Sequence, residues 1–570
     1  MSLLVVSLFA VSTLLGTEST DGVSDVRIRT YIAPACVICE TNVVKSTELL
    51  GLSRGQVCEG RFGSSRGTKL VNDGETAGLL LDFGRELHGG IQLGLSPRGG
   101  GPVRLHVRFG ESVSEAMSEL GEKNAGNDHA MRDYSLEVPA FGTIETGNTG
   151  FRFVWLGLEE KGEVGLEFVC AVSLMRPMKR VGGFKCSDER LNRVFETAVR
   201  TVHLCCQDYL WDGIKRDRLV WAGDLHPETL TVLSVFGAAD VIPQTLDYIA
   251  ATTPADAWAN GFPTYTLSWI RNLAAWYRFT GDQSYLARYA EYLTAVFSHV
   301  QTVLPEGVWR KEGGFGAFLD WPTHHNSAAE LAGAQALAVM TMEDLSELLS
   351  AVGRPASATE AKHLLAKMRS VCPDPCGTKS AAALLALSGL KTPGDMFKTV
   401  LSQQGHSGVS TFYGYYMIEA MSAAGENQRA MDTVRDYWGG MLDMGATSFW
   451  EDFNLAWTNG CFRIDELPVA GKKDIHGDFG DFCYKGFRHS LCHGWSAGPA
   501  DWCIRHVLGI RALDVGCKTV EVRPNLCDLA WAEGALALPN GRVVRVRAEK
   551  GKNGAVDVQI DAPDDVRIVR

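Results

Sequence analysis

The hydrophobic periodicity of this chain changes twice, and the two changes divide it into three regions. From about Val26 to Met178, short apolar runs such as AGLLLDFG and PVRLHVRFG are separated by Gly and Pro, as in a series of strands. From Cys186 the apolar residues recur at helical spacing, beginning in SDERLNRVFETAV. The last segment, with KTVEVRPN and AVDVQIDAP, alternates again. Because 570 residues exceed what one hydrophobic core usually organises, we expect separate domains.

We predict a multidomain, mainly α chain in which a helical toroid is flanked by an N-terminal and a C-terminal β-sandwich. The predicted ranges are 1–178 for a jelly-roll-like sandwich, 179–509 for the toroid and 510–570 for the second sandwich. About a dozen helical segments fit a closed ring of hairpins better than a compact bundle. Their connecting loops, rich in Gly, Trp, Asp and His, should then gather at one end of the ring.

Three local signals make this prediction specific. Ser187 is expected to be the N-cap of the first helix of the toroid. Asn540-Gly541, between two alternating runs, predicts a β-hairpin. The segment RHSLCHGWSAGPADWCIRHVL is expected to be helical.

The charge balance limits the classes of partner. The formal net charge is −12 and the chain lacks a long basic tract, which argues against nucleic acid and an anionic membrane. Fifteen cysteines are spread through the sequence, and the two tight groups, Cys36-Val-Ile-Cys39 and Cys372-Pro-Asp-Pro-Cys376, have no second CxxC or HxxxH nearby to complete a zinc site. We therefore expect mostly reduced thiols and no structural metal.

The compartment is predicted from the same cysteines and from the N-terminus. Many free thiols favour the cytoplasm. The run MSLLVVSLFAVSTLLG has the apolar length of a signal-peptide core but lacks a basic start and a clean cleavage site, so a buried strand is the alternative. A secreted or periplasmic location follows if residues 1–16 are a signal peptide.

The stretch WDGIKRDRLVWAGD is the most unusual part of the sequence. Two of its three aspartates and one of its tryptophans would share one face of a continuous helix with a glutamate that follows the stretch. Gly213 and Gly223, however, favour a loop that runs into a helix. A structural ion-pair network, with Arg216 and Arg218 holding the acids, is the alternative to a functional site. The residues on that shared face are Asp217, Trp221, Asp224 and Glu228.

Three other stretches place acids or histidines beside indole rings. In SFWEDFNLAW, Glu451 and Asp452 follow Trp450, and burial against an aromatic wall raises a carboxyl pKa. A helix N-terminus would also explain these acids. FLDWPTHHN contains Asp320 and Trp321, and RHSLCHGWSAGP contains His489 and His493 before Trp495. A lone histidine is more often a satisfied hydrogen-bonding residue than a catalyst.

The repeated pairing of acid and tryptophan predicts a sugar site. Carboxylates accept hydrogen bonds from vicinal hydroxyls, indole faces pack on the C–H face of a sugar ring, and two carboxylates can cleave a glycosidic bond. HExxH, a P-loop and a dinucleotide fingerprint are all missing from the sequence. We therefore predict no cofactor, no catalytic metal and a carbohydrate as the partner, with the oligomeric state left open.

The stretch DGIKRDRLVWAGD resembles the central motif of the α-L-rhamnosidases of glycoside hydrolase family 78. Further resemblance lies in LDFGRELHGGIQ, RFGESVSEAMSE, NDHAMRD, GNTGFRFVWL, GFRHSLCHGWSAGP and the final β segment, all similar to one branch of these enzymes. It extends from about residue 26 to the end and is looser at the N-terminus. The resemblance implies an (α/α)6 barrel flanked by β-sandwiches and inverting hydrolysis of terminal α-L-rhamnose.

The resemblance also implies roles for individual residues. Asp217 falls where the family has its general acid, and Glu451 where it has the general base that activates water. The expected substrate contacts, from the resemblance and from the acid–indole pairs, are Asp212, Arg216, Trp221, Asp224, Asp320, Trp321, Trp450 and His493.

One departure from the family motif leaves alternatives open. The family acid is usually Glu, whereas Asp217 is one methylene shorter and lies between two arginines that should depress its pKa. The leading hypothesis is an inverting exo-α-L-rhamnosidase. The alternatives are a lyase or a glycosidase for another sugar on the same scaffold, and an inactive carbohydrate-binding relative.

Overall fold

The computed structural model describes residues 24–51, 67–97, 102–311, 315–552 and 554–570. The apolar run at residues 1–16 lies outside these ranges, and so does Cys58. The fourteen cysteines within them are free thiols, and every helix within them is too short or too polar to cross a membrane.

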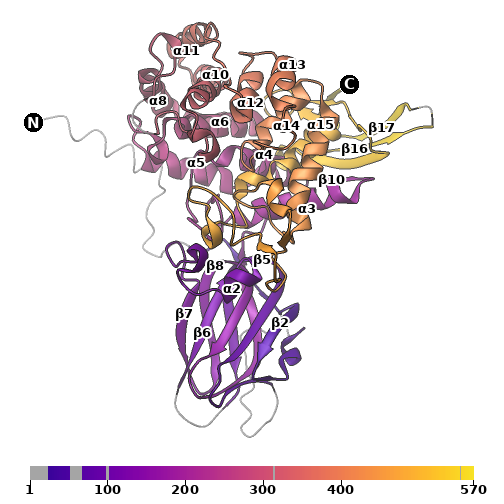
Figure 1. Cartoon of the computed structure of the whole chain (residues 1–570). Coiled ribbons are helices and arrows are strands. Elements are labelled where there is room, and N and C mark those ends of the chain that lie inside the picture. The colour runs from indigo at the N-terminus through magenta and orange to yellow at the C-terminus, as the bar shows by residue number, and fades with distance from the viewer. Residues whose placement is uncertain (1–23, 52–66, 98–101, 312–314, 553) are drawn as a thin grey trace, which may run out of the picture.

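The N-terminal β region is a nine-stranded sheet, seen in the lower part of Figure 1. Its main path runs β3-β4-β9-β5-β8-β6-β7, while β1 pairs with β9 and β2 with β5. Breaks in the register of β5 between Asp82 and Leu87 let this long strand bend, and the strands enclose one apolar core. The strands are β1 (Ile28–Ile32), β2 (Cys36–Thr41), β3 (Val43–Val44), β4 (Thr68–Asn72), β5 (Ala77–Leu95), β6 (Val103–Gly110), β7 (Asp133–Val138), β8 (Gly142–Leu158) and β9 (Gly162–Met175).

The middle of the chain is helical and contains a closed ring. Helix α4 contacts α6, α6 contacts α10, α10 contacts α12, α12 contacts α14, α14 contacts α17, and α17 returns to α4. This closure is what the predicted toroid requires. The helices are α3 (Glu189–Cys205), α4 (Leu225–Phe236), α5 (Val241–Thr252), α6 (Pro263–Thr280), α7 (Gln283–Ala287), α8 (Ala290–Thr302), α9 (Trp321–His324), α10 (Ser327–Ala351), α11 (Pro355–Met368), α12 (Lys379–Leu387), α13 (Pro393–Met396), α14 (Gly414–Ala423), α15 (Asn427–Thr433), α16 (Gly439–Asp443) and α17 (Pro499–Trp502).

A cavity of about 700 Å³ lies inside this ring and extends to the C-terminal strands. Ion pairs occupy much of its wall, among them Arg278 with Asp344 at 2.7 Å and Arg505 with Asp501 at 3.2 Å. The charged groups of this wall are thus largely matched with each other.

The C-terminal β region contains two sheets, whose longest strands lie at the right of Figure 1. The predicted hairpin is confirmed, because β15 and β16 pair antiparallel on either side of Asn540, which has φ 61°. Strand β10, which lies within the range predicted for the toroid, pairs with β15, so this sheet combines strands from both ends of the ring. The sheets are β10 (Gly183–Cys186) with β15 (Trp531–Ala537), β16 (Val543–Lys550) and β17 (Val556–Asp561), and β13 (Ile510–Ala512) with β14 (Thr519–Val522) and β18 (Arg567–Val569); a short pair, β11 (Cys461–Phe462) and β12 (Lys473–Asp474), lies in a loop.

Two helix predictions are wrong in detail. The N-cap of α3 is Asp188, whose carboxylate accepts from the amides of Arg190 at 2.8 Å and Leu191 at 3.3 Å. In RHSLCHGWSAGPADWCIRHVL, the part from His489 to His493 is an extended loop, and α-helix begins only at Pro499. Gly and Pro at 494, 498 and 499 interrupt the helical pattern there.

The cap at Asp188 gives a test of stability. Asp188→Ala removes a carboxylate whose Oδ1 accepts from two helix amides and whose Oδ2 accepts from Arg435 Nε at 2.7 Å. We expect the free energy of unfolding to fall by about 1 kcal/mol, measured by denaturant unfolding. Ser187→Ala is the matched control, because Ser187 Oγ makes one exposed hydrogen bond, to the amide of Ala530. An equal loss in both variants would contradict the assignment of Asp188 as the cap.

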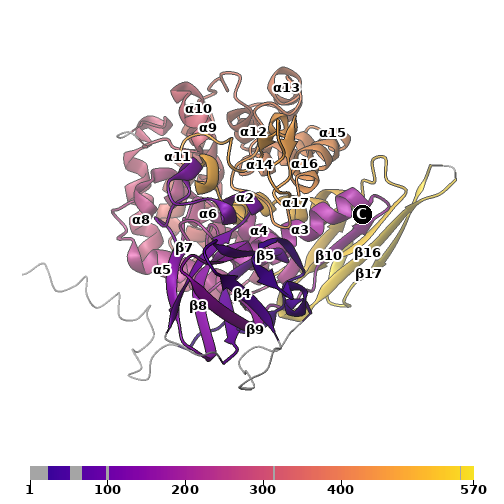
Figure 2. The same cartoon turned by 60° about the horizontal axis from the view of Figure 1, so that its bottom comes forward.

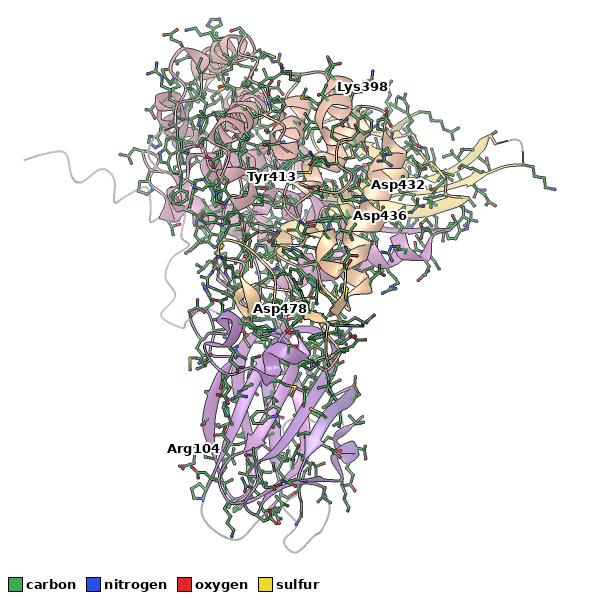
Figure 3. All side chains as sticks on the ribbon, in the orientation of Figure 1. Arg104, Lys398, Tyr413, Asp432, Asp436 and Asp478 are labelled. Atoms are coloured by element: carbon green, nitrogen blue, oxygen red, sulfur yellow. The ribbon has the colours of Figure 1, made fainter. Side chains whose placement is uncertain are left out.

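The N-terminal sheet is joined to the helical region by charged contacts. In Figure 2, helix α2 (Val113–Met117) lies between the strands and the helices. Arg152 of β8 binds Asp82 of β5 at 2.8 Å and donates to the carbonyl oxygen of Gly445 at 3.1 Å. Lys123 Nζ lies 2.7 Å from Asp478, which Figure 3 shows where the two parts meet. The N-terminal sheet region therefore contacts the loops at this end of the ring directly.

Candidate active site

Nine of the ten predicted site residues line one cavity of about 160 Å³ at the end of the ring that faces the N-terminal sheet. At roughly 30 Å³ per water molecule, this volume suits a single sugar ring rather than a chain. The cavity is lined by Asp212, Arg216, Asp217, Trp221, Asp224, Phe262, Tyr265, Phe318, Leu319, Asp320, Trp321, Phe412, Glu451, Cys483, Tyr484, His493 and Trp495.

The tenth predicted residue, Trp450, does not line this cavity. Its side chain is fully buried and packs edge-on against Phe453 and His489. It belongs to the core behind the cavity wall, so a direct sugar contact by Trp450 does not agree with the structure. The indole that reaches the cavity from this side is Trp495, whose Nε1 donates to the carbonyl oxygen of Glu451 at 3.0 Å.

The central motif is a loop that runs into α4, as its two glycines indicate. A Cβ atom at Gly223 would lie 2.1 Å from the ring of Tyr265, so only glycine allows this loop to approach α6. Gly213 forms a β-bridge with His493. The motif and the late His493 loop are therefore fixed against each other through their backbones.

Asp217 occupies a strained position at the tip of this loop. Asp217 and Arg218 have φ values of 52° and 57°, in the left-handed region that non-glycine residues rarely adopt. The Asp217 carboxylate accepts from Trp221 Nε1 at 3.1 Å and lies 2.9 Å from His129 Nδ1. These contacts aim the carboxylate at the cavity that Asp217 and Trp221 line.

Arg216 joins the two acids to which the resemblance gives catalytic roles. Its Nη1 lies 3.1 Å from Glu451 Oε1, and its Nε lies 3.5 Å from Asp217 Oδ1. One guanidinium therefore holds both carboxylates on the same cavity. Arg218 points elsewhere and donates to the carbonyl oxygens of Asn148 at 2.7 Å and His129 at 3.1 Å.

The electrostatic environment of Asp217 keeps it ionised. Burial alone would raise its pKa, but the hydrogen bond from His129 and the charge of Arg216 hold the pKa of Asp217 well below its ordinary value. Arg216 therefore lowers the pKa of Asp217 as predicted. The other group that lowers it is His129, where the sequence suggested Arg218. In the free protein, Asp217 is a carboxylate at neutral pH.

Glu451 is more deeply buried, and its pKa moves the other way. Burial raises the pKa of Glu451, although Arg216 and a backbone hydrogen bond from Ser490 oppose the increase. Its Oε2 accepts from the Ser490 amide at 3.1 Å. A buried carboxylate with a raised pKa is a better proton acceptor than an exposed one. The neighbouring Asp452 does not line the cavity.

Three further buried polar residues form the floor of the cavity. Burial raises the pKa of Asp212 and of Asp224 well above their ordinary values; repulsion from Asp224 adds to the effect at Asp212, and repulsion from Asp217 and Glu451 adds to it at Asp224. Burial lowers the pKa of His493 to about 3. His493 Nε2 lies 3.4 Å from Asp224 Oδ2, and its Nδ1 has no hydrogen-bond partner. Asp224 Oδ1 is likewise buried without a hydrogen-bond partner, so two polar atoms beside this cavity are unsatisfied within the protein. The oxygen and nitrogen atoms of these three residues lie within 4.8 Å of one another, so the group could also hold a cation.

Asp320 and Trp321 come from the segment that leads into α9. The Asp320 side chain caps α9 by accepting from the amide of Thr323 at 2.9 Å, and burial raises its pKa to about 6. Trp321 lies on the outer wall against Phe318, with ring centroids 5.2 Å apart. The two acid–indole pairs at Asp217 and Asp320 therefore share one cavity, as the sequence predicts.

Sequence reasoning missed the contribution of the N-terminal sheet and of several aromatic residues. His129, in the stretch NDHAMRD, reaches Asp217 from the loop before β7, and this stretch was singled out only by its resemblance to the family. Tyr265 on α6 hydrogen-bonds Asp224, and Tyr484 stacks under Arg216 at 5.6 Å. Contacts of this kind depend on the tertiary fold and leave no local pattern.

The helical region matches a known family model. Residues 179–372 match the model described as the bacterial alpha-L-rhamnosidase six-hairpin glycosidase domain. No curated protein matches the chain.

Several solved structures share the fold. A GH78 family rhamnosidase of Bacillus sp. GL1 has a TM-score of 0.70 at 22% identity, over 87% of this chain and 53% of that chain. A rhamnosidase from Klebsiella oxytoca with rhamnose bound has a TM-score of 0.67 at 19% identity, over 87% of this chain and 97% of that one. An α-L-rhamnosidase from Aspergillus terreus has a TM-score of 0.67 at 16% identity, over 86% and 59%. The chain thus spans about half the length of the Bacillus protein but nearly all of the Klebsiella protein.

Proposed function

We propose that this protein is a glycoside hydrolase that releases terminal α-L-rhamnose, because residues 179–372 match the six-hairpin glycosidase domain of the bacterial alpha-L-rhamnosidases. The observation that carries the proposal is that Asp217 and Glu451 share the guanidinium of Arg216 at the edge of one small cavity with indole walls. Glycoside hydrolysis generally requires two carboxyl groups that face one sugar-sized cavity. The small cavity favours removal of one terminal residue.

The proposed mechanism is inversion. Because Asp217 is a carboxylate in the free protein, it must first take up a proton from solvent; it then gives this proton to the glycosidic oxygen while the bond from that oxygen to the anomeric carbon breaks. Glu451 takes a proton from a water molecule whose oxygen attacks the same carbon from the opposite face. Inverting enzymes keep the two carboxyl groups about 6.5–9.5 Å apart to admit this water, and a shared guanidinium separates the two acids here.

The remaining cavity residues are proposed to bind the sugar. Asp212, Asp224 and His493 have polar atoms available for ring hydroxyls, while Trp221 and Trp321 supply flat apolar surface. Asp320, with its raised pKa, is a further hydroxyl ligand. We also propose that the two β-rich regions are the sandwiches expected to flank an (α/α)6 barrel.

A panel of aryl glycosides tests this function. We expect the protein to hydrolyse an aryl α-L-rhamnoside and to leave aryl glycosides of other sugars intact. Proton NMR during the first turnovers should show β-L-rhamnose as the initial product. Initial release of the α anomer would contradict inversion, and exclusive cleavage of another glycoside would reassign the substrate.

A second candidate function follows from the ionised state of Asp217. If the contacts with His129 and Arg216 persist when sugar is bound, Asp217 has no proton to donate and the protein binds rhamnose without turnover. A thermal shift with rhamnose and no product from any aryl glycoside would support this alternative.

A further inference from the structure

A buried ion cluster joins the N-terminal sheet to the wall of the candidate active site. Glu111, directly after β6, and Glu115 on α2 are both fully buried, and Lys215 of the central motif inserts between them. Lys215 Nζ lies 3.0 Å from Glu111 Oε2 and 3.1 Å from Glu115 Oε1. None of these three residues lines the sugar-sized cavity. Their role is therefore not explained by sugar contact.

The cluster is well satisfied and is held by its own local structure. Although burial lowers it, the pKa of Lys215 is raised by the two carboxylates, so the cation is retained. Lys215 Nζ also donates to the carbonyl oxygens of Phe487 at 2.9 Å and His489 at 2.7 Å. Glu115 accepts from the amide of Glu111 at 2.8 Å, which fixes the turn between β6 and α2. A single lysine thus ties the sheet, the central motif and the segment 487–489 together.

Glu111 has a second set of contacts, one residue further along that segment. Its Oε2 accepts from the amide of Leu491 at 2.5 Å, and its Oε1 accepts from Ser490 Oγ at 3.4 Å. Burial raises the pKa of Glu111 to about 7, while Lys215 opposes the increase. The Glu111 carboxylate thus forms an ion pair with Lys215 and accepts hydrogen bonds from Ser490 and Leu491.

Ser490 in turn holds the proposed general base. The Ser490 amide donates to Glu451 Oε2 at 3.1 Å, and the Glu451 amide donates to the Ser490 carbonyl oxygen at 2.9 Å. Lys215 directly precedes Arg216, the other residue that binds the Glu451 carboxylate. The two hydrogen-bond partners of the Glu451 carboxylate, Ser490 and Arg216, are therefore linked to Glu111, either directly or through one neighbouring residue, while His493 Nδ1 lies 3.9 Å from Glu451 Oε1.

We propose that Glu111, a residue of the N-terminal sheet region, is a positioning residue that orients the Glu451 carboxylate through Ser490 and through the Lys215-Arg216 backbone. The inference rests on the proposed function of Glu451 as the base. On this proposal, the N-terminal region contributes to catalysis by orienting the Glu451 carboxylate. Even a small displacement of a catalytic group lowers the reaction rate by a large factor.

The test uses the full-length protein and Glu111→Gln, which keeps the shape and removes the charge. We expect kcat on an aryl α-L-rhamnoside to fall roughly 10- to 100-fold with little change in KM, because the base is misplaced while the sugar contacts remain. Asp133→Asn is the matched control, since Asp133 is a buried acid of the same region that pairs with Arg108 and His106. Its kcat should stay near that of the wild type.

A double-variant cycle separates positioning from a general loss of structure. If Glu111 acts through Glu451, adding Glu111→Gln to Glu451→Gln should cause little further loss of kcat. A purely structural effect would give losses that multiply. Glu111→Asp, which keeps the charge, should recover part of the activity.

The outcomes distinguish this inference from the proposed function. A wild type that hydrolyses none of the aryl glycosides contradicts the proposed function and the inference with it. An active wild type with an unchanged Glu111→Gln variant, or with multiplicative losses in the cycle, contradicts the inference alone.

Discussion

Replacing Glu451 by glutamine is expected to lower kcat on an aryl α-L-rhamnoside by about 10²- to 10⁴-fold, the usual contribution of a general base. The amide cannot take a proton from the attacking water, yet its one oxygen can still accept from the Ser490 amide and from Arg216 Nη1, which lie 3.1 Å and 3.2 Å from Glu451 Oε2. Folding and sugar binding should therefore survive. Initial rates, with circular dichroism as a check of folding, measure the effect.

The adjacent carboxylate provides the matched control. Asp452 shares the aromatic surroundings of Glu451, and burial raises its pKa to about 7, but it does not line the cavity. Asp452→Asn should keep most of the activity. If Asp452→Asn is inactive while Glu451→Gln turns over normally, Asp452 is the base and the assignment here is wrong.

The general architecture follows from periodicity, because helices and strands impose different spacings on apolar residues. The ring from α4 to α17 and the hairpin at Asn540 were both predictable on this basis. The pairing of β10 with β15 was not, since strand pairing over such a distance in sequence leaves no local pattern. Ser187 and Asp188 are equally good N-caps by residue type, and only the geometry of the turn decides between them.

The candidate site was predictable where chemistry is concentrated in short stretches. Asp212, Asp217 and Trp221 lie in one motif, and the recurrence of acid beside indole in other stretches predicts a sugar site. Trp450 shows the limit of this reasoning, because adjacency to Glu451 in an extended loop sends the two side chains to opposite sides. His129 shows a second limit, since its contact with Asp217 joins the N-terminal β region to a loop of the helical region.

The charge around Asp217 was predictable only in part. Two flanking arginines suggested that both would depress its pKa, but the left-handed backbone at Asp217 and Arg218 turns the second guanidinium away towards Asn148. His129 contacts the Asp217 carboxylate instead of Arg218. The His129 ring is held by Arg488, whose Nη2 lies 2.8 Å from His129 Nε2. Backbone conformation thus decides which neighbour acts on the acid.

Asp217→Asn should produce a loss of kcat that depends on the leaving group. A general acid assists departure of the glycosidic oxygen, so the loss should be about 10²- to 10⁴-fold for an alkyl rhamnoside and much smaller for a strongly activated aryl rhamnoside. The amide keeps the hydrogen bond from Trp221 Nε1, so the loop is preserved. Equal losses on both substrates would mean that Asp217 binds sugar and donates no proton.

His129→Asn tests the same role through the pH profile. A general acid works in its protonated form, so activity is lost as the pH rises through its pKa. Although burial raises the pKa of Asp217, the hydrogen bond from His129 contributes to holding it well below its ordinary value; removing His129 raises the pKa and moves the high-pH limb of kcat to higher pH. A limb that stays in place would leave Asp217 as an ionised sugar ligand, and another cavity carboxyl with a raised pKa, such as Asp224, would have to supply the proton.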